Sequence, residues 1–241
     1  MAQILYDKIR GLSVKLTGIF GLVRAEVSML AALERCSQRD IKIRTVIDVG
    51  ASDGRWALMV RKFFPDAYYF LIEAQDGHEK VLEKIRSKYK NIDYIVSAAG
   101  DYNGTVYFDA GDPFGGLASH TPLEKNCIEV PMVMIDSLVK ERSLTPPFLL
   151  KLDTHGFEVP IFEGAKETLK KTALIVVEAY NFKLTSKSLR FHEMCSYMES
   201  LGFRCIDLCD PIHRPNDRAF WQMDLLFIPS DRKEFLSNSY E

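Results

Sequence analysis

The residues that most clearly could bind a ligand or take part in a reaction lie in DVGASDGRW, residues 48–56, directly after the apolar run TVI. Two carboxylates, Asp48 and Asp53, and two glycines, Gly50 and Gly54, stand close together in this stretch. Glycines at the end of a strand let the backbone approach a ligand closely, and nucleotide-binding loops use them in this way. The stretch therefore predicts a site for a nucleotide-like ligand.

The spacing of the glycines disfavours a dinucleotide. A dinucleotide loop has the pattern G-x-G-x-x-G, but Ser52 and Arg55 stand where its second and third glycines would be. Asp48 and Asp53 would repel a pyrophosphate. They suit S-adenosylmethionine (SAM), which carries an ammonium and a sulfonium and has no phosphate. The loop therefore favours SAM over NAD.

Three further residues are expected to contact the adenosine part of the ligand. Glu73 ends the apolar run AYYFLIEA, 19 residues beyond Gly54, and an acid at this place can accept both ribose hydroxyls. NAD and SAM sites share this feature. Ser97 and Ala98 end the next apolar run and are placed to flank the adenine. The alternative for each polar residue is a turn former or a helix cap.

The candidate catalytic residues are Asp153 and His155, which follow the apolar run PFLLKL. A histidine is a natural base near neutral pH, and Asp153 could orient it or bind an acceptor hydroxyl. The alternative for His155 is a loop residue that caps the next helix or bonds Glu158. Asp153 could also join Glu178 in holding a divalent ion. Their distance in sequence disfavours that reading, and we expect no metal.

From residue 45 onward the chain alternates apolar runs with amphipathic stretches. This pattern predicts a parallel sheet with helices on both faces, in which ligands bind at the carboxyl ends of the strands. The stretch 109–128 is rich in glycine and proline, and we expect it to be irregular. Its part from Gly111 to Thr121 is either a lid over the acceptor or a mobile surface loop. The expected strands are residues 45–50, 67–74, 92–100, 103–108, 147–156, 173–180, 203–208 and 223–229, and residues 130–139 are expected to form a strand that leads into a short helix.

Composition excludes several classes of protein. The net charge is −2 and the basic residues are scattered, so we expect no nucleic-acid partner. The five cysteines form no CxxC pair, which favours free thiols in a reducing cytoplasm. The longest apolar run near the start, LTGIFGLV, is too short to cross a membrane, so we expect neither an integral membrane segment nor a signal peptide.

Residues 1–40 are expected to form a helical extension, and residues 41–241 the main domain. Apolar residues recur in the extension at three- and four-residue steps, from Ile9 to Val27 and Leu30. That stripe could pack on the main domain or on a second copy of the chain, giving a homodimer. Its basic residues also suit a membrane surface, but Asp7 and Glu26 dilute this character.

Several segments together resemble the FkbM-type methyltransferase family, over about residues 44–228. They are VIDVGASDG, FLIEA, SAAGDYNGTVYF, LLKLDTHGFEVPIFEGA, VVEAY and WQMDLLFI. The resemblance implies a Rossmann-like α/β fold with a seven-stranded, mostly parallel sheet and an antiparallel last strand. It also implies SAM as cofactor and O-methylation of a hydroxyl on a sugar or another small molecule.

The resemblance further implies roles for individual residues. Asp48, Gly50, Ala51, Asp53 and Gly54 would line the methionine end of SAM, and Glu73 would hold its ribose. The family pattern K-I-D-x-E-G-x-E has a glutamate where this chain has His155, while Asp153, Gly156 and Glu158 keep the pattern. This departure leaves open a protein of the same fold that binds SAM, or serves as a scaffold, without catalysis. A nucleotide-dependent oxidoreductase is disfavoured by the missing glycines.

Overall fold

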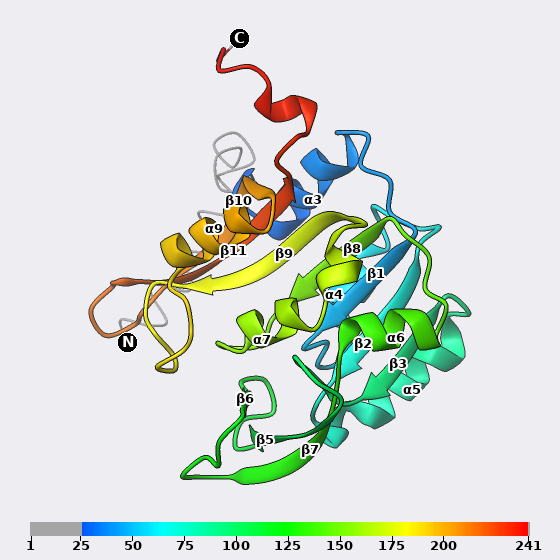
Figure 1. Ribbon diagram of the computed structural model, residues 1–241, viewed down its shortest axis with the longest axis vertical. Coiled ribbons are helices and arrows are strands. Elements are labelled where there is room, and N and C mark those ends of the chain that lie inside the picture. The colour runs from blue at the N-terminus through cyan, green and yellow to red at the C-terminus, as the bar shows by residue number, and fades with distance from the viewer. Residues whose placement is uncertain (1–25, 241) are drawn as a thin grey trace, which may run out of the picture.

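A computed structural model describes residues 26–240 of the protein, and a seven-stranded sheet forms its centre (Figure 1). The strand order is β10-β11-β9-β8-β1-β2-β3. The strands are β1 (Thr45–Val49), β2 (Tyr68–Glu73), β3 (Ile92–Val96), β8 (Phe148–Leu152), β9 (Thr172–Tyr180), β10 (Phe203–His213) and β11 (Phe220–Pro229). The first five are parallel, and β11 runs antiparallel to both β9 and β10. The expected fold is therefore confirmed.

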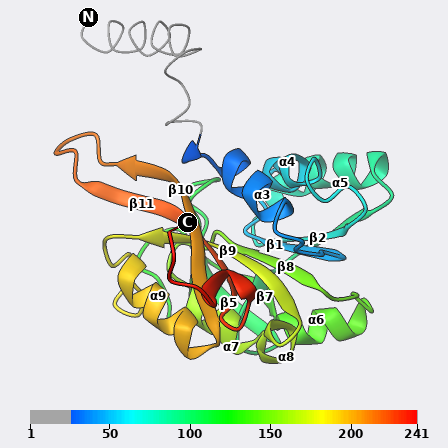
Figure 2. The same cartoon turned by 90° about the horizontal axis from the view of Figure 1, so that it is seen from above.

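Helices cover both faces of this sheet (Figure 2). One face carries α3 (Met29–Ser37), α4 (Arg55–Val60) and α5 (Glu79–Lys88), and the other carries α6 (Ile135–Glu141), α7 (Glu158–Glu163), α8 (Lys166–Leu169) and α9 (Phe191–Ser200). Every residue of β1 and β8 is buried, which explains why these strands read as nearly continuous apolar runs. Side chains alternate between the faces, so Val46 packs under α3–α5 and Ile47 under the opposite helices. Residues 26–240 also contain two short 3-10 helices, η1 (Asp76–His78) and η2 (Lys233–Phe235).

A second, four-stranded sheet lies next to the carboxyl ends of the parallel strands (Figure 1). It consists of β4 (Ala98–Ala99), β5 (Gly104–Asp109), β6 (Leu117–Ser119) and β7 (Cys127–Val133), in the order β4-β7-β5-β6. The expectation that residues 109–128 are irregular is wrong for β6 and for the start of β7. Short strands whose partners lie far away in sequence leave a weak local pattern, and here the pairing with β5 defines them.

The part of the N-terminal extension that the structure describes packs on the main sheet. Ser28 caps α3 by accepting a hydrogen bond from the Ala31 N–H (3.3 Å). Ala32, Leu33 and Cys36 are fully buried against strands of the sheet, whereas Leu30, expected on the apolar stripe, is 46% exposed. The helix expected before residue 26, and any pairing with a second copy through it, lie outside the described residues. Across residues 26–240, no helix combines the length and the apolar character that crossing a bilayer requires.

Candidate functional site

A cavity of about 500 Å³ opens at the carboxyl ends of the parallel strands, where sequence reasoning expected the ligand. Eight of the ten predicted site residues line it: Gly50, Ala51, Asp53, Glu73, Ser97, Ala98, Asp153 and His155. The structure thus brings together residues from β1, β2, β3 and β8 and from the loops that follow them. Asp48 and Gly54 do not line the cavity. The side chain of Asp48 is fully buried, and a Cβ on Gly54 would point into the packed interior behind the loop.

The two glycines of the loop are required by the fold itself. Both have positive φ angles, +72° at Gly50 and +74° at Gly54. A Cβ on Gly50 would stand 2.0 Å from the carbonyl oxygen of Asp153, and one on Gly54 would stand 2.7 Å from the side chain of Ile85. The sequence correctly marked these positions as special, but the structure supplies a packing reason in place of the expected approach to a ligand.

Glu73 holds the glycine loop in place at the end of β2. Its Oε2 accepts a hydrogen bond from the Ser52 N–H (2.6 Å), and its Oε1 accepts one from the Gln75 N–H (2.8 Å). Each carboxylate oxygen has a second lone pair, so these bonds leave acceptor capacity on a side chain that borders the cavity. The geometry suits a pair of ribose hydroxyls.

Two buried polar atoms at the cavity have no hydrogen-bond partner within the described part of the chain. They are Ser52 Oγ and Trp56 Nε1, and both residues line the cavity. Buried polar groups are rarely left without a partner, so this pair indicates that a ligand with polar groups belongs here. Sequence reasoning missed Trp56, which shows in the sequence only as an apolar residue of the following helix.

Asp53 is engaged by its neighbour. Its carboxylate accepts two hydrogen bonds from the Arg55 guanidinium, Nε to Oδ1 at 2.8 Å and Nη2 to Oδ2 at 2.6 Å. The hydrogen bonds from Arg55 lower the pKa of Asp53. The Arg55 guanidinium also lies over the ring of Phe114, 5.3 Å from its centroid. Asp53 therefore joins the glycine loop to the segment that crosses the cavity.

That segment, residues 109–116, is fastened over one side of the cavity. The Gln75 side chain donates to the carbonyl oxygens of Asp112 (3.0 Å) and Pro113 (3.3 Å). Pro113, Phe114 and Gly116 line the cavity.

A row of charged side chains crosses one face of the central strands. Asp48 on β1 stands beside Lys151 on β8 in the register, and Glu178 on β9 stands beside Asp224 on β11. Lys151 Nζ lies 3.4 Å from Asp48 Oδ1 and 3.0 Å from Asp153 Oδ2. Sequence reasoning missed Lys151 and Asp224. The signal that could have found them is a single charged residue within an otherwise apolar central strand.

Burial and charge control how this row titrates. Burial raises the pKa of Asp48 to about 6, although Lys151 partly offsets the effect. Burial likewise raises the pKa of Asp224 to about 7, reinforced by the charge of Asp153. For Lys151, burial favours the neutral amine, but Asp153 and Asp48 outweigh it and raise its pKa. The lysine ammonium is therefore held charged by its two carboxylates.

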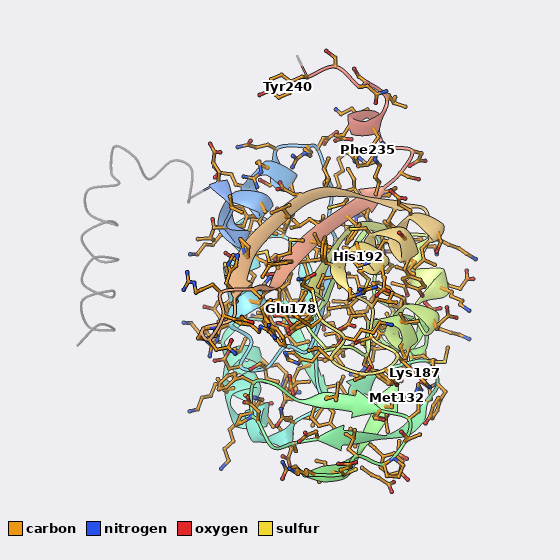
Figure 3. The ribbon with its side chains drawn as sticks, turned by 90° about the vertical axis from the view of Figure 1, so that its left-hand side faces the viewer. Met132, Glu178, Lys187, His192, Phe235 and Tyr240 are labelled. Carbon is orange, nitrogen blue, oxygen red and sulfur yellow. The ribbon has the colours of Figure 1, made fainter. Side chains whose placement is uncertain are left out.

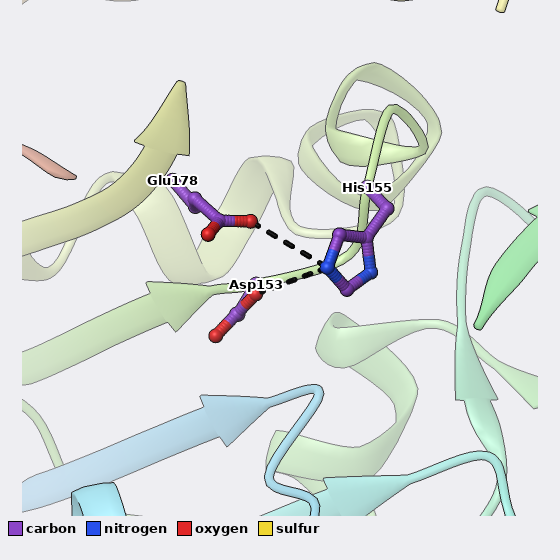
Figure 4. Close-up of side chains that lie close together, drawn as sticks. All are labelled: Asp153, His155 and Glu178. Carbon is purple, nitrogen blue, oxygen red and sulfur yellow. Dashed lines mark ion pairs between the residues drawn. The ribbon is translucent and has the colours of Figure 1, made fainter. Parts of the chain in front are cut away.

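Asp153, His155 and Glu178 converge at the edge of the cavity (Figure 4). His155 Nε2 lies 3.7 Å from Asp153 Oδ1 and 3.6 Å from Glu178 Oε2. Burial and the charge of Asp153 raise the pKa of Glu178, while Lys151 and His155 lower that of Asp153 against the effect of burial. The side chain of Glu178, labelled in Figure 3, is 13% exposed, and its carboxylate accepts hydrogen bonds from Tyr180 and Gln222.

Comparison with known proteins identifies the family. Residues 48–205, more than half of the chain, match the model of the Methyltransferase FkbM domain. The chain belongs to the FkbM methyltransferase family. This assignment covers the glycine loop, Glu73 and the Asp153–His155–Glu178 cluster. No curated protein matches the sequence.

Several solved structures are similar to this FkbM-family chain at low sequence identity. Methyltransferase FkbM from Methylobacillus flagellatus KT is 15% identical, with a TM-score of 0.51 over 76% of this chain. The match spans 43% of that protein, less than half of its length. A precorrin-6y C5,15-methyltransferase from Geobacter metallireducens GS-15 is 11% identical (TM-score 0.42, 82% of this chain and 86% of its own). An uncharacterized protein from Listeria monocytogenes serotype 4b is 10% identical (TM-score 0.48, 83% and 68%).

Proposed function

We propose that the protein is a SAM-dependent O-methyltransferase that acts on a hydroxyl of a small-molecule or carbohydrate acceptor. The observation that carries this proposal is a single cavity that joins two kinds of group. Glu73 suits the ribose of SAM, and the unpartnered atoms of Ser52 and Trp56 suit its amino acid end. Asp153 and His155 line the same cavity and supply groups for acid–base catalysis. The family assignment supports methyl transfer as the reaction.

The residues present fit SAM. Glu73 would hold the ribose, and Ser97 and Ala98 would flank the adenine. The hydroxyl of Ser52 and the indole N–H of Trp56 are free to bond the amino acid end, next to Gly50 and Ala51. When bound, SAM supplies a methyl carbon that bonds to the acceptor oxygen as the carbon–sulfur bond breaks, with its electron pair passing to sulfur.

The chain's own residues would align the acceptor and remove its proton. Transfer of a methyl group needs the acceptor oxygen in line with the carbon and water kept out of the site. Segment 109–116 covers the cavity, and the Asp153–His155 pair lies where the hydroxyl would stand. In the simplest version of this mechanism, His155 Nε2 takes the hydroxyl proton as general base.

An aromatic group beside the cluster supports a carbohydrate or similar acceptor. Tyr180 bonds Glu178 and meets Trp221 edge to face (centroids 5.7 Å apart), and Trp221 stacks on Phe182 (5.3 Å). The Arg214 guanidinium lies 4.3 Å above the Phe182 ring. Aromatic rings with a nearby guanidinium suit the faces and hydroxyls of a sugar.

The free thiols of all five cysteines support a reducing, cytoplasmic setting.

Calorimetric titration with SAM, S-adenosylhomocysteine and NAD tests the cofactor assignment. We expect both sulfur ligands to bind and NAD not to bind. Glu73→Ala should weaken binding by more than tenfold, because it removes the proposed ribose acceptor and releases the Ser52 and Gln75 N–H groups. Binding of NAD without either sulfur ligand would overturn the proposal in favour of an oxidoreductase. Glu79→Ala, an exposed glutamate at the start of α5, is the control.

A further inference from the structure

The Asp153–His155–Glu178 cluster gathers three side chains with metal-ligating atoms around His155 Nε2. The two carboxylate oxygens lie 3.7 and 3.6 Å from His155 Nε2, beyond ordinary hydrogen-bond length. One ligand atom from each of the three side chains lies within 4.8 Å of the others. Figure 4 shows both carboxylates pointing toward the same nitrogen. The three groups surround a common point.

The other ring nitrogen of His155 fixes the tautomer of the neutral imidazole. Nδ1 lies 3.1 Å from the carbonyl oxygen of Gly116, and a carbonyl can only accept a hydrogen bond. Nδ1 therefore carries the proton, and Nε2 presents a lone pair to the oxygens of Asp153 and Glu178. Three electron-rich atoms then face one another, an arrangement that a cation between them would stabilise. A histidine that bonds a backbone carbonyl through one nitrogen while its other nitrogen faces outward is the arrangement found at metal sites.

Each of the three side chains is also held from behind by a second group. Lys151 Nζ donates to Asp153 Oδ2 (3.0 Å), so Oδ1 is the oxygen turned toward His155. Tyr180 and Gln222 donate to the Glu178 carboxylate, and Gly116 orients the imidazole. Such outer partners orient the ligands of a metal ion and keep them in place before it binds.

The surroundings of the cluster are rich in carboxyl groups. Asp48, Asp153, Glu178 and Asp224 lie along the charged row, and Lys151 pairs with Asp48 and Asp153. Within residues 26–240, Glu178 has His155 as its ion-pair partner, and Asp224 has none. A cation bound at the cluster would stabilise the ionised form of these carboxyls.

We propose that Asp153, His155 and Glu178 bind a divalent first-row transition ion at the floor of the acceptor site. A donor set of one imidazole and two carboxylates suits Mn²⁺, Fe²⁺ or Zn²⁺. Ligands about 2.1 Å from an ion with tetrahedral angles lie about 3.4 Å from one another, close to the gaps at the cluster. The three side chains fill only part of the coordination sphere, and the remaining positions face the cavity.

The role of the ion rests on the proposed function, although its binding does not. A hydroxyl that coordinates the ion is fixed at the cluster and loses its proton more easily. The proton would then pass to water, which reaches the partly exposed side chains of Asp153 and His155. His155 would serve as a ligand and no longer as the base, so the two versions of the mechanism differ in their need for metal.

Titration of tag-free protein with Mn²⁺ in the absence of SAM tests the site. Calorimetry and electron paramagnetic resonance measure the binding. We expect one ion per chain. His155→Ala and Glu178→Gln should each weaken binding by more than about 100-fold, beyond the range for outer partners. His192→Ala, which removes an imidazole from α9 (Figure 3), should leave binding unchanged. If the folded protein binds no Mn²⁺ or Zn²⁺, or if the variants bind as tightly as the wild type, the metal site is overturned.

A chelator experiment separates this inference from the proposed function. SAM binding measured with and without EDTA should be the same, because Glu73 and the glycine loop do not depend on the ion. Methyl transfer should fall at least tenfold with EDTA and return on addition of Mn²⁺. Full transfer in EDTA would overturn the role of the ion and retain the methyltransferase with His155 as base. Failure of SAM to bind would overturn the proposed function, while Mn²⁺ binding would still stand.

Discussion

At the residue scale, the buried pair of Asp48 and Lys151 shows how strongly the interior constrains the chemistry of this fold. Both side chains are buried, and neither oxygen of Asp48 accepts a well-formed hydrogen bond from any described residue. The ammonium group of Lys151, 3.4 Å from Asp48 Oδ1, compensates the negative charge of Asp48. Buried ion pairs give little net stability, but the loss of one partner leaves a charge without compensation. The pair is therefore sensitive to single substitutions.

Lys151→Met should destabilise the protein by about 3–5 kcal/mol, because it leaves Asp48 and Asp153 without their ammonium partner. Urea unfolding followed by circular dichroism measures the change. Lys170→Met is the matched control, since Lys170 is exposed and pairs with Glu167 on the surface. It should change the free energy of unfolding by less than about 0.5 kcal/mol. Similar losses in both variants would contradict this account of the buried pair.

Asp48 also makes stability depend on pH. Its pKa in the folded state, about 6, lies above the unfolded value, so the folded state holds the proton more tightly. The resulting stabilisation is complete below about pH 4 and is lost as the pH rises through about 6. Asp48→Asn removes this group. The stability of the variant relative to wild type should therefore rise between pH 4 and pH 7, by on the order of 3 kcal/mol. Urea unfolding at several pH values checks this, and a difference that stays constant would speak against it.

At the element scale, the small sheet and segment 109–116 shape the cavity. Gly116 borders the cavity, and its carbonyl accepts from His155. A Cβ at this position would stand 2.2 Å from the ring of Phe108, and 3.0 Å from the amide nitrogen of Gln75, which fastens the segment. The packing between β5 and this segment thus determines where the imidazole of His155 is held.

Gly116→Ala should cost about 1–3 kcal/mol of stability through overpacking against Phe108, and should lower kcat/KM through displacement of the segment. Gly77→Ala is the control, because a Cβ there meets no atom within 4 Å. Thermal unfolding and a methyl-transfer assay on both variants measure the two effects. Equal behaviour of the variants would show that the segment tolerates the added methyl group.

At the scale of the whole molecule, α3 shares a core with the sheet. The guanidinium of Arg35 donates to both oxygens of Asp207 on β10 (2.7 and 2.8 Å), and the Met29 N–H donates to Asp210 (3.1 Å). Leu33 is buried in the same cluster as residues of β1, β2 and β8. These contacts predict that residues 29–37 unfold together with the sheet.

Leu33→Ala should cost about 2–5 kcal/mol and leave a single cooperative unfolding transition. Leu30→Ala in the same helix should cost much less, since this side chain is half exposed. Chemical unfolding followed by fluorescence and by circular dichroism compares the variants. Two separate transitions, or equal losses at the two positions, would show that α3 is an independent unit.

The sequence by itself determined the strands of the central sheet, the glycine loop and the family. Buried parallel strands are apolar along their whole length, and positive φ angles at Gly50 and Gly54 leave a visible mark, so both features are local. Glu73 could be placed in the same way, because it ends a strand at a fixed distance from the loop. The prediction that Leu30 lies on the buried apolar stripe is wrong, because the strands that α3 covers determine which of its faces is buried.

Only the tertiary structure decided which charged groups meet. Asp153 and Glu178 come from neighbouring strands, and their distance in sequence had argued against a shared ion. Lys151 reads as an interruption of an apolar strand until the pairing of β1 with β8 places Asp48 beside it. Likewise, the carbonyl that orients His155 comes from a segment 39 residues earlier in the chain. Sheet register and long-range packing set these contacts, and neither is written in the local pattern of the residues.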